Sequence, residues 1–300
     1  MILIFEASPK LVTQYKMDPV KMGQVNQFKD KFVDIASPGV LAARIFKQQD
    51  EKPLLLAPIG GKIGQKIKEI AKTEKLGLVD IDFRDESMEE VRLGLEDPLI
   101  LQSRPARVTQ EEFNRLFSTL ASYQEEVKNF LLLGASESIE EKYPYLIRKS
   151  YDLGHPVFVC LEGRIQDCIK EKPYSLVCSK DQLEDYSGLK CNFTHEVIQA
   201  GKMVLAAGVR ELFIGGSGKT SIYMRDHSYW TIQSQDLTRQ DLTLITIGLS
   251  GAYEKKYDLE MALKFARGLG AFDSQVVNQI DLADLKQKMK DLSIKEGKFE

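Results

Sequence analysis

Residues 211–234 read ELFIGGSGKTSIYMRDHSYWTIQS, and the structure of this stretch decides how the surrounding chain is interpreted. The phosphate-binding P-loop pattern, G-x-x-x-x-G-K-[ST], is nearly matched, but Phe213 stands at its first glycine. A P-loop also needs a helix behind the phosphates. The residues after Lys219 are instead rich in aromatic and β-branched types and lack a helical period. We therefore predict a strand at 211–214, a glycine turn, and two strands joined near Asp226.

The composition is that of a soluble globular protein. The chain has 300 residues, of which 43% are hydrophobic and 28% are charged, enough for one large domain or two small ones. The 41 basic and 44 acidic residues give a net charge of −3, which provides no electrostatic reason to expect nucleic acid or an anionic membrane as partner. No apolar run reaches the length of a membrane span, and MILIFEASPK is typical of a first strand rather than a signal peptide. We expect a cytoplasmic protein.

Cysteine and histidine are too scattered to indicate a metal site. None of the four cysteines forms a C-x-x-C pair, and the three histidines lie far apart in the sequence. A zinc site or cysteine–histidine catalysis is therefore not expected, and reduced thiols are the simpler interpretation.

Strand-like runs alternate with helical patterns along most of the chain. The expected strands are 2–7, 53–59, 129–135, 155–163, 174–178 and 211–216, and the expected helices are 38–47, 60–77, 111–127, 139–154, 180–188, 194–208, 241–255 and 258–271. This alternation predicts an α/β fold with a mainly parallel central sheet flanked by helices. Two segments, 12–35 and 78–104, break the rhythm with a period of two and are predicted to form a small separate β-sheet. The end of the chain, from about Asp281, is predicted to be a polar helix.

Several short strings, in this order, resemble the PfkB (ribokinase-like) sugar kinases, and among them 1-phosphofructokinase and tagatose-6-phosphate kinase. The strings are Met22-Gly23-Gln24-Val25-Asn26, Ile59-Gly60-Gly61-Lys62-Ile63-Gly64 and the helix Asp258 to Ala271. The resemblance covers nearly the whole chain. It implies a single ribokinase-like domain over 1–300, with lid insertions at 12–35 and 78–104. It also implies ATP and Mg²⁺ as cofactors and a sugar or sugar phosphate as substrate.

The same resemblance implies where a nucleotide would lie. The family has S-L-G-x-x-G between two strands beside the nucleotide, and Gly216 fits the glycine of that motif, which makes Gly216, Ser217 and Gly218 expected nucleotide contacts. The family's K-P-N-x-x-E motif reads VCSKDQ from Val177 here, so that Ser179 falls at the nucleotide and magnesium site.

The catalytic motif is altered. The family's G-A-G-D holds the developing phosphate charge on backbone N–H groups and supplies an Asp as general base. Here it reads Gln240-Asp241-Leu242-Thr243, so both glycines are replaced and Thr243 stands in the position of the base. Asp241 could act as base only if the loop slips by two residues. Its other role, as N-cap of the following helix, is the favoured one.

The substrate motifs have changed as well. In G-G-K-G-I-N only Gly39 remains, with Pro38 in place of the lysine and Leu41 in place of the asparagine. Val12 replaces the Asp that grips the sugar hydroxyls, and Met88 replaces the Arg of the lid motif. Two phosphate-binding cations of the family are therefore absent from these positions.

These changes favour a homologue of the phosphosugar kinases that is catalytically weak or inactive and acts as a nucleotide- or metabolite-binding module. The alternative is an active ATP-dependent kinase that uses Asp241 as base on an altered sugar-like substrate. A homodimer formed through the lid is a further expectation.

Overall fold

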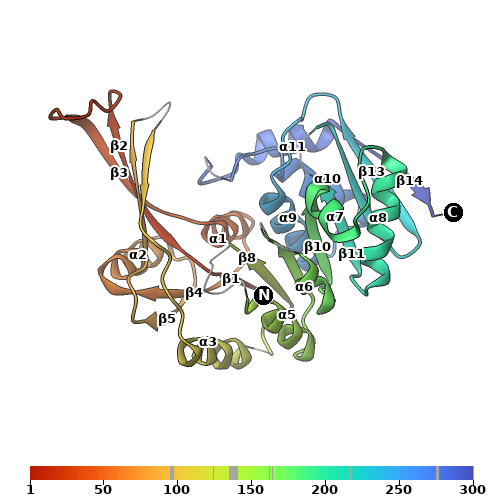
Figure 1. The fold of residues 1–300 in the computed structure, drawn as a ribbon, viewed down its shortest axis with the longest axis horizontal. Helices are drawn as coiled ribbons and strands as arrows, with labels where there is room; N and C mark the ends of the chain where they lie inside the picture. The colour runs from red at the N-terminus through yellow and green to blue at the C-terminus, as the bar shows by residue number, and fades with distance from the viewer. Residues whose placement is uncertain are drawn as a thin grey trace.

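The structure is a computed structural model that describes residues 1–94, 98–123, 125–134, 141–161, 163, 165–215, 218–274 and 277–299. It contains a large and a small β-sheet (Figure 1). The large sheet has, in spatial order, the strands β14 (Leu292–Lys298), β13 (Ser228–Ser234), β12 (Thr220–Arg225), β11 (Glu211–Gly215), β10 (Ser175–Ser179), β9 (Val157–Cys160), β8 (Asn129–Leu133), β1 (Ile2–Glu6), β4 (Leu54–Gly60) and β5 (Leu78–Phe83). The strands from β11 to β5 are parallel, whereas β12, β13 and β14 are antiparallel.

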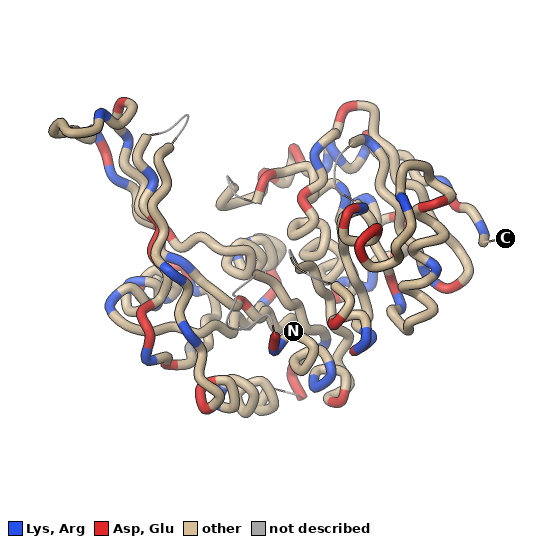
Figure 2. The backbone as a smooth tube through the Cα atoms, in the orientation of Figure 1, with Lys and Arg blue, Asp and Glu red and all other residues tan. Residues whose placement is uncertain are grey.

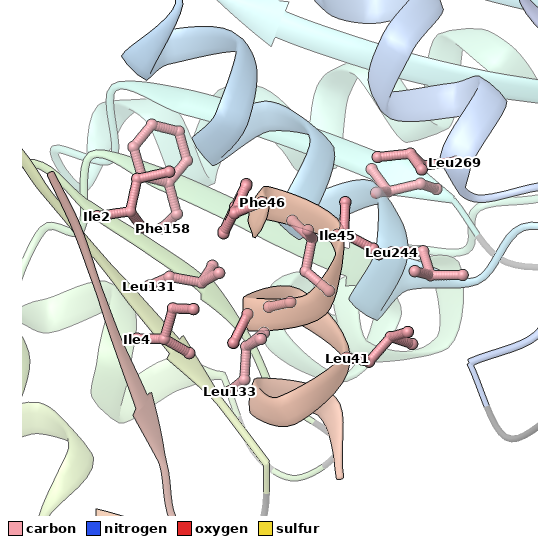
Figure 3. Close-up of a cluster of buried hydrophobic side chains, with 14 of the residues drawn as sticks. Ile2, Ile4, Leu41, Ile45, Phe46, Leu131, Leu133, Phe158, Leu244 and Leu269 are labelled. Atoms are coloured by element: carbon pink, nitrogen blue, oxygen red, sulfur yellow. The ribbon is translucent and has the colours of Figure 1, made fainter. Parts of the chain in front are cut away.

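Helices cover both faces of this sheet, because its strands are apolar on both sides. One face packs against α1 (Pro38–Gln48), α2 (Gly61–Glu74), α9 (Leu242–Glu254), α10 (Leu259–Leu269) and α11 (Leu282–Lys290). The other packs against α3 (Gln110–Ser122), α5 (Tyr143–Asp152), α6 (Gln166–Lys170), α7 (Lys180–Ser187) and α8 (Thr194–Ala206). Figure 3 shows the first core, in which Ile4 and Leu133 from the sheet meet Ile45 of α1 and Leu244 of α9.

The small sheet has the strand order β3 (Phe28–Ala36), β2 (Lys10–Met17), β6 (Met88–Leu93) and β7 (Leu99–Gln102). Its base is fixed to the core, where Leu11 and Ile35 are buried. Its far end extends away from the rest of the chain (Figure 1).

A buried arginine joins the base of the small sheet to the helices. In α1, the Arg44 guanidinium donates to Asp34 of β3 at 2.5 Å and to both carboxylate oxygens of Glu74 in α2, at 2.7 and 2.8 Å. It also donates to the Ile35 carbonyl at 3.2 Å. Burial alone would lower the pKa of Arg44, but the two carboxylates outweigh burial and raise the pKa above its ordinary value. Arg44 is therefore charged and joins three elements.

The fold class expected from the sequence is confirmed, and so is the hairpin after the glycine turn. Thr220–Arg225 is a strand, not a helix, and it pairs antiparallel with both β11 and β13. The turn lies at Asp226, whose φ of 54° places it in the left-handed region.

Two segments differ from the prediction. Residues 78–83 were expected in the small sheet but form β5, which pairs with β4 at the edge of the large sheet, because the turn after α2 brings them alongside β4. Residues 292–298 were expected to be the end of a helix but form β14. There the edge of β13 offers seven paired residues, from Ser228 to Ser234, and these hydrogen-bonding partners outweigh the local helical preference.

Lys and Arg positions are interspersed with Asp and Glu positions along the described backbone (Figure 2). Within the described ranges, no helix has both the length and the apolar character needed to cross a membrane.

Candidate functional site

The candidate site lies at the carboxyl edge of the large sheet, where parallel α/β folds bind their ligands. Asp241 lies there as the N-cap of α9, and its carboxylate accepts from the Leu244 N–H at 3.0 Å. Its second oxygen accepts from the Ser274 N–H at 2.8 Å. Both carboxylate oxygens are thus engaged by backbone donors, one on the helix of Asp241 itself and one on the segment after α10.

The side chains on either side of Asp241 fill the space above the end of β11. A Cβ atom added to Gly215 would lie 2.7 Å from Leu242 Cδ2 and 2.9 Å from Gln240 Oε1. The Gln240 amide donates to the carbonyls of Gly218, at 2.8 Å, and Thr220, at 3.1 Å, and it accepts from Ser221 Oγ at 2.7 Å. Gln240 therefore ties the start of α9 to the glycine turn.

A buried carboxylate occupies the N-terminus of α1 in a similar way. Glu6, at the end of β1, accepts from the Gly39 N–H at 2.6 Å and from the Ser8 N–H at 3.0 Å, and only 1% of its surface is exposed. Burial raises the pKa of Glu6 above its ordinary value, and the N–H donors offset this effect only in part. A Cβ on Gly39 would lie 2.6 Å from the Glu6 Cβ, so a side chain cannot be added at residue 39 without displacing Glu6.

A cavity of about 170 Å³ lies between the small sheet, α1 and the segment after α10. Its wall combines apolar groups with charged and polar ones, namely Val12, Pro38, Leu41, Lys10, Arg92 and Ser274. The volume is below the range of roughly 300–1,000 Å³ that is typical of small-molecule sites. Because Ser274 is both part of the wall and a donor to Asp241, the cavity adjoins the cap of α9.

The cations of this cavity are neutralised by the protein itself. Glu90 of β6, with 3% of its surface exposed, accepts from Lys10 at 2.5 Å and from Arg92 at 2.6 Å. Arg44 is paired with Asp34 and Glu74. Three cations therefore face three carboxylates, and the cavity carries no excess positive charge for a phosphate dianion.

We expect Glu90→Gln to lower the free energy of unfolding by about 1–2 kcal/mol at pH 7, since hydrogen bonds to charged groups are lost. Burial alone would raise the pKa of Glu90, but Lys10 and Arg92 hold it below the ordinary value of 4.5. A carboxylate with a lowered pKa stabilises the fold above its ordinary pKa and loses that effect on protonation. The difference between wild type and variant in urea unfolding should therefore shrink as the pH falls below 4.5. A difference that is independent of pH would contradict this assignment.

The structure brings together only some of the substrate and catalytic residues that were predicted from the sequence. Val12 and Leu41 line one cavity, and Gly39 lies beside it in the first turn of α1. Met88, at the start of β6, is buried beneath Ser8, whose hydroxyl lies 3.0 Å from its sulfur. Thr243 lies in the first turn of α9.

Of the predicted nucleotide contacts, Ser179 is the N-cap of α7 and its hydroxyl accepts from the Gln182 N–H at 3.1 Å. Gly218 follows the end of β11 with a φ of +104°, a conformation that favours glycine. Gly216 and Ser217 lie outside the described residues.

Sequence reasoning missed the carboxylates that shape this site. Glu6 is the one charged residue in the apolar run ILIFEA, and a charge inside a strand that is buried on both faces could have identified it. Glu90 gave no such signal, because Lys10 meets it only through the pairing of β2 with β6, although Arg92 lies two residues further along the same strand.

The phosphate end of a nucleotide does not fit the start of α9 as it stands. Phosphates bind helix N-termini through free backbone N–H groups. Here the Asp241 carboxylate accepts from that terminus, and Gln240 and Leu242 occupy the adjoining space. Across the described residues, no three His, Cys, Asp or Glu side chains gather into a group that could hold a metal ion.

This architecture is the ribokinase-like fold. A search with models of protein families found no match to the chain. Among solved structures, a candidate phosphofructokinase from Staphylococcus aureus superimposes with a TM-score of 0.89, at 16% identity and with all of both chains covered. Phosphofructokinase-2 from Escherichia coli in complex with fructose-6-phosphate gives a TM-score of 0.82, at 12% identity over 96% of this chain and 98% of that one. A protein designated a possible 1-phosphofructokinase, from Thermotoga maritima, gives 0.79 at 14% identity over 99% of each chain.

These neighbours confirm the resemblance predicted from the sequence at the level of the fold. The large mainly parallel sheet, its flanking helices and the separate small sheet are shared over almost the whole length.

Proposed function

We propose that this protein is a homologue of the PfkB carbohydrate kinases that transfers phosphate weakly or not at all and that binds a small metabolite at the carboxyl edge of its sheet. The fold shared with phosphofructokinases supports the lineage. The observation that supports a loss of catalysis is the state of Asp241, both of whose carboxylate oxygens accept backbone hydrogen bonds. Phosphotransfer from ATP by wild type and by Asp241→Asn tests this proposal.

The charge of the cavity supports a ligand with few or no phosphate groups. The phosphate-directed cations expected at Pro38 and Met88 are absent, and the cations that remain are paired with carboxylates. Paired ionic groups still donate and accept hydrogen bonds, so hydroxyl groups of a sugar or related polyol suit this wall, with Val12 and Leu41 beneath the apolar face of the ring.

One observation favours the alternative, an active kinase. One oxygen of the Asp241 carboxylate accepts from the N–H of Ser274, a residue that lines the cavity. A movement of the segment after α10 would break this hydrogen bond and free that oxygen. In that case Asp241 would become the base, and its substitution would abolish turnover.

We further propose that a second copy of this chain covers the small sheet. Among the residues that the structure describes, both edge strands, β3 and β7, lack a paired strand on their outer side, and they carry exposed apolar residues. These are Phe28, Phe32, Val33, Leu99, Ile100 and Leu101, each at least 44% exposed. Apolar groups that project from a sheet with open edges are typical of a protein interface. The E. coli neighbour is also known in a tetrameric inhibited form.

We expect the wild-type protein to be dimeric at micromolar concentration and the double variant Phe32→Glu/Leu101→Glu to be monomeric. Two charges on the exposed strands would have to be buried without partners in the interface. Sedimentation velocity measures the oligomeric state, with Met261→Glu on α10, an apolar residue that is 43% exposed, as a control that should leave the dimer intact. A wild type that remains monomeric at high concentration would contradict the interface.

A further inference from the structure

A second cavity lies at the opposite, amino edge of the large sheet. It has a volume of about 800 Å³, within the range of small-molecule sites, and we call it the amino-edge cavity. Its walls come from the turns that lead into β9, β10 and β11, at 154–156, 172–174 and 208–210, and from the C-terminal ends of α5, α8 and α9. Because the candidate kinase site lies at the other end of the same strands, the two sites do not share residues.

One wall of the amino-edge cavity is aromatic. The rings of Tyr174 and Tyr253 are 5.3 Å apart, and each lies 5.5 Å from Phe158 behind them. Tyr253 is 41% exposed, and Tyr151 on the facing helix end is 68% exposed. Rings that are packed on one side and open on the other offer rigid surfaces for stacking a planar ligand.

Two cations are held at the rim of this aromatic wall. The side chain of Lys172 lies along Gly208, where an added Cβ would be only 2.8 Å from Lys172 Cδ, so the absence of a side chain at Gly208 leaves room for it. Arg210 places its guanidinium 5.7 Å from the centre of the Tyr174 ring. Within the described ranges, neither cation forms an ion pair.

Two acidic residues of this region, Asp226 and Glu211, both contact a third cation, Arg225. Asp226, on the rim, contacts Arg225 at 3.5 Å. Glu211, buried below Tyr174, lies at the same distance from the other side of Arg225. Two carboxylates thus lie among three cations, Lys172, Arg210 and Arg225, so this cavity combines aromatic surfaces with one excess positive charge, whereas the cavity at the carboxyl edge is balanced.

We propose that the amino-edge cavity binds a small organic anion with a planar ring, whose face stacks on Tyr253, whose edge meets Tyr174 because the two tyrosine rings are inclined at 68°, and whose anionic group lies between Lys172 and Arg210. The ring and the charge are both required, because each wall supplies only one of the two interactions. The anionic group can be a carboxylate or a phosphate, and the choice of probes separates these two.

Isothermal titration calorimetry of the full chain with four probes tests this assignment. 4-Hydroxyphenylacetate carries a ring and a carboxylate, uridine 5′-monophosphate a ring and a phosphate, 4-hydroxybenzyl alcohol a ring alone, and inorganic phosphate the anion alone. We expect at least one of the first two probes to bind about tenfold more tightly than both probes that lack one of the two features. If neither ring-bearing anion binds more tightly than the ring alone, the proposal is wrong.

Variants then locate the binding. Lys172→Glu and Arg210→Glu alter exposed side chains, so the fold should persist, and each should weaken binding about tenfold or more. Lys52→Glu, an exposed charge reversal by the start of β4, is the matched control and should leave the affinity unchanged. Leu205→Trp, which fills the cavity from the end of α8, should abolish binding. An affinity unaffected by either reversal or by Leu205→Trp would place the ligand elsewhere and overturn the proposal. None of these results depends on whether the carboxyl-edge site transfers phosphate.

Discussion

Purified protein should transfer phosphate from ATP to fructose 1-phosphate or tagatose 6-phosphate at a rate near background, and Asp241→Asn should leave that rate unchanged. A positioned general base contributes roughly 10²–10⁴-fold to the rate, and loss of one oxyanion-type donor costs about 10²–10³-fold more. These factors share one site and will not multiply cleanly, but they act in the same direction. Coupled detection of ADP, with an intact kinase of this fold as positive control, measures the rate.

Asp241→Asn is the informative change because it separates the two roles of the residue. The asparagine oxygen can still accept from the Leu244 N–H and cap α9, but its amide NH₂ cannot accept from the Ser274 N–H, so Asp241→Asn should cost some stability but less than the loss of both acceptors. Asp241→Ala removes the acceptor of the Leu244 and Ser274 N–H groups and should cost about 1 kcal/mol of stability or more. Ordinary kinase rates that Asp241→Asn abolishes would make Asp241 the base and would establish the alternative function.

Arg44→Met should lower the free energy of unfolding by about 2–4 kcal/mol. Removing one member of a buried ionic network costs roughly 3–5 kcal/mol, because the remaining charges lose their partner. That cost is reduced here, since the side chains of Asp34 and Glu74 are 31% and 32% exposed and water can solvate them. Urea unfolding followed by circular dichroism measures the change.

The matched control is Lys29→Met on the same small sheet. Lys29 and Asp18 are 3.5 Å apart but 71% and 84% exposed, so the loss of their contact should change stability by less than about 0.5 kcal/mol. If Arg44→Met cost no more than this control, the network would not be what fixes the small sheet to α1 and α2. A loss confined to the small sheet would appear as a separate early transition, because Asp34 is its link to Arg44.

Local sequence patterns were sufficient to predict the secondary structure of segments whose residue types favour one conformation. The run after Lys219 is rich in residues that favour strands, and it forms β12 and β13 as predicted. Asp241 and Asp258 precede apolar helical patterns, and each accepts a hydrogen bond from the third N–H of its helix. The order of strands and helices, with the strings shared with the PfkB kinases, was enough to predict the fold.

The tertiary structure alone decided the contacts of the last strand, of the buried carboxylates and of the amino-edge cavity. The helical pattern predicted through 292–298 is overridden, because LSIKEGK pairs with the open edge of β13. Glu6 carries no local sign that its carboxylate would take the N–H of Gly39, which lies thirty-three residues away. The amino-edge cavity exists because three turns distant in sequence enter neighbouring parallel strands. Local propensity is a property of adjacent residues, whereas burial, ion pairing and cavities depend on chain segments that meet only after the sheet has formed.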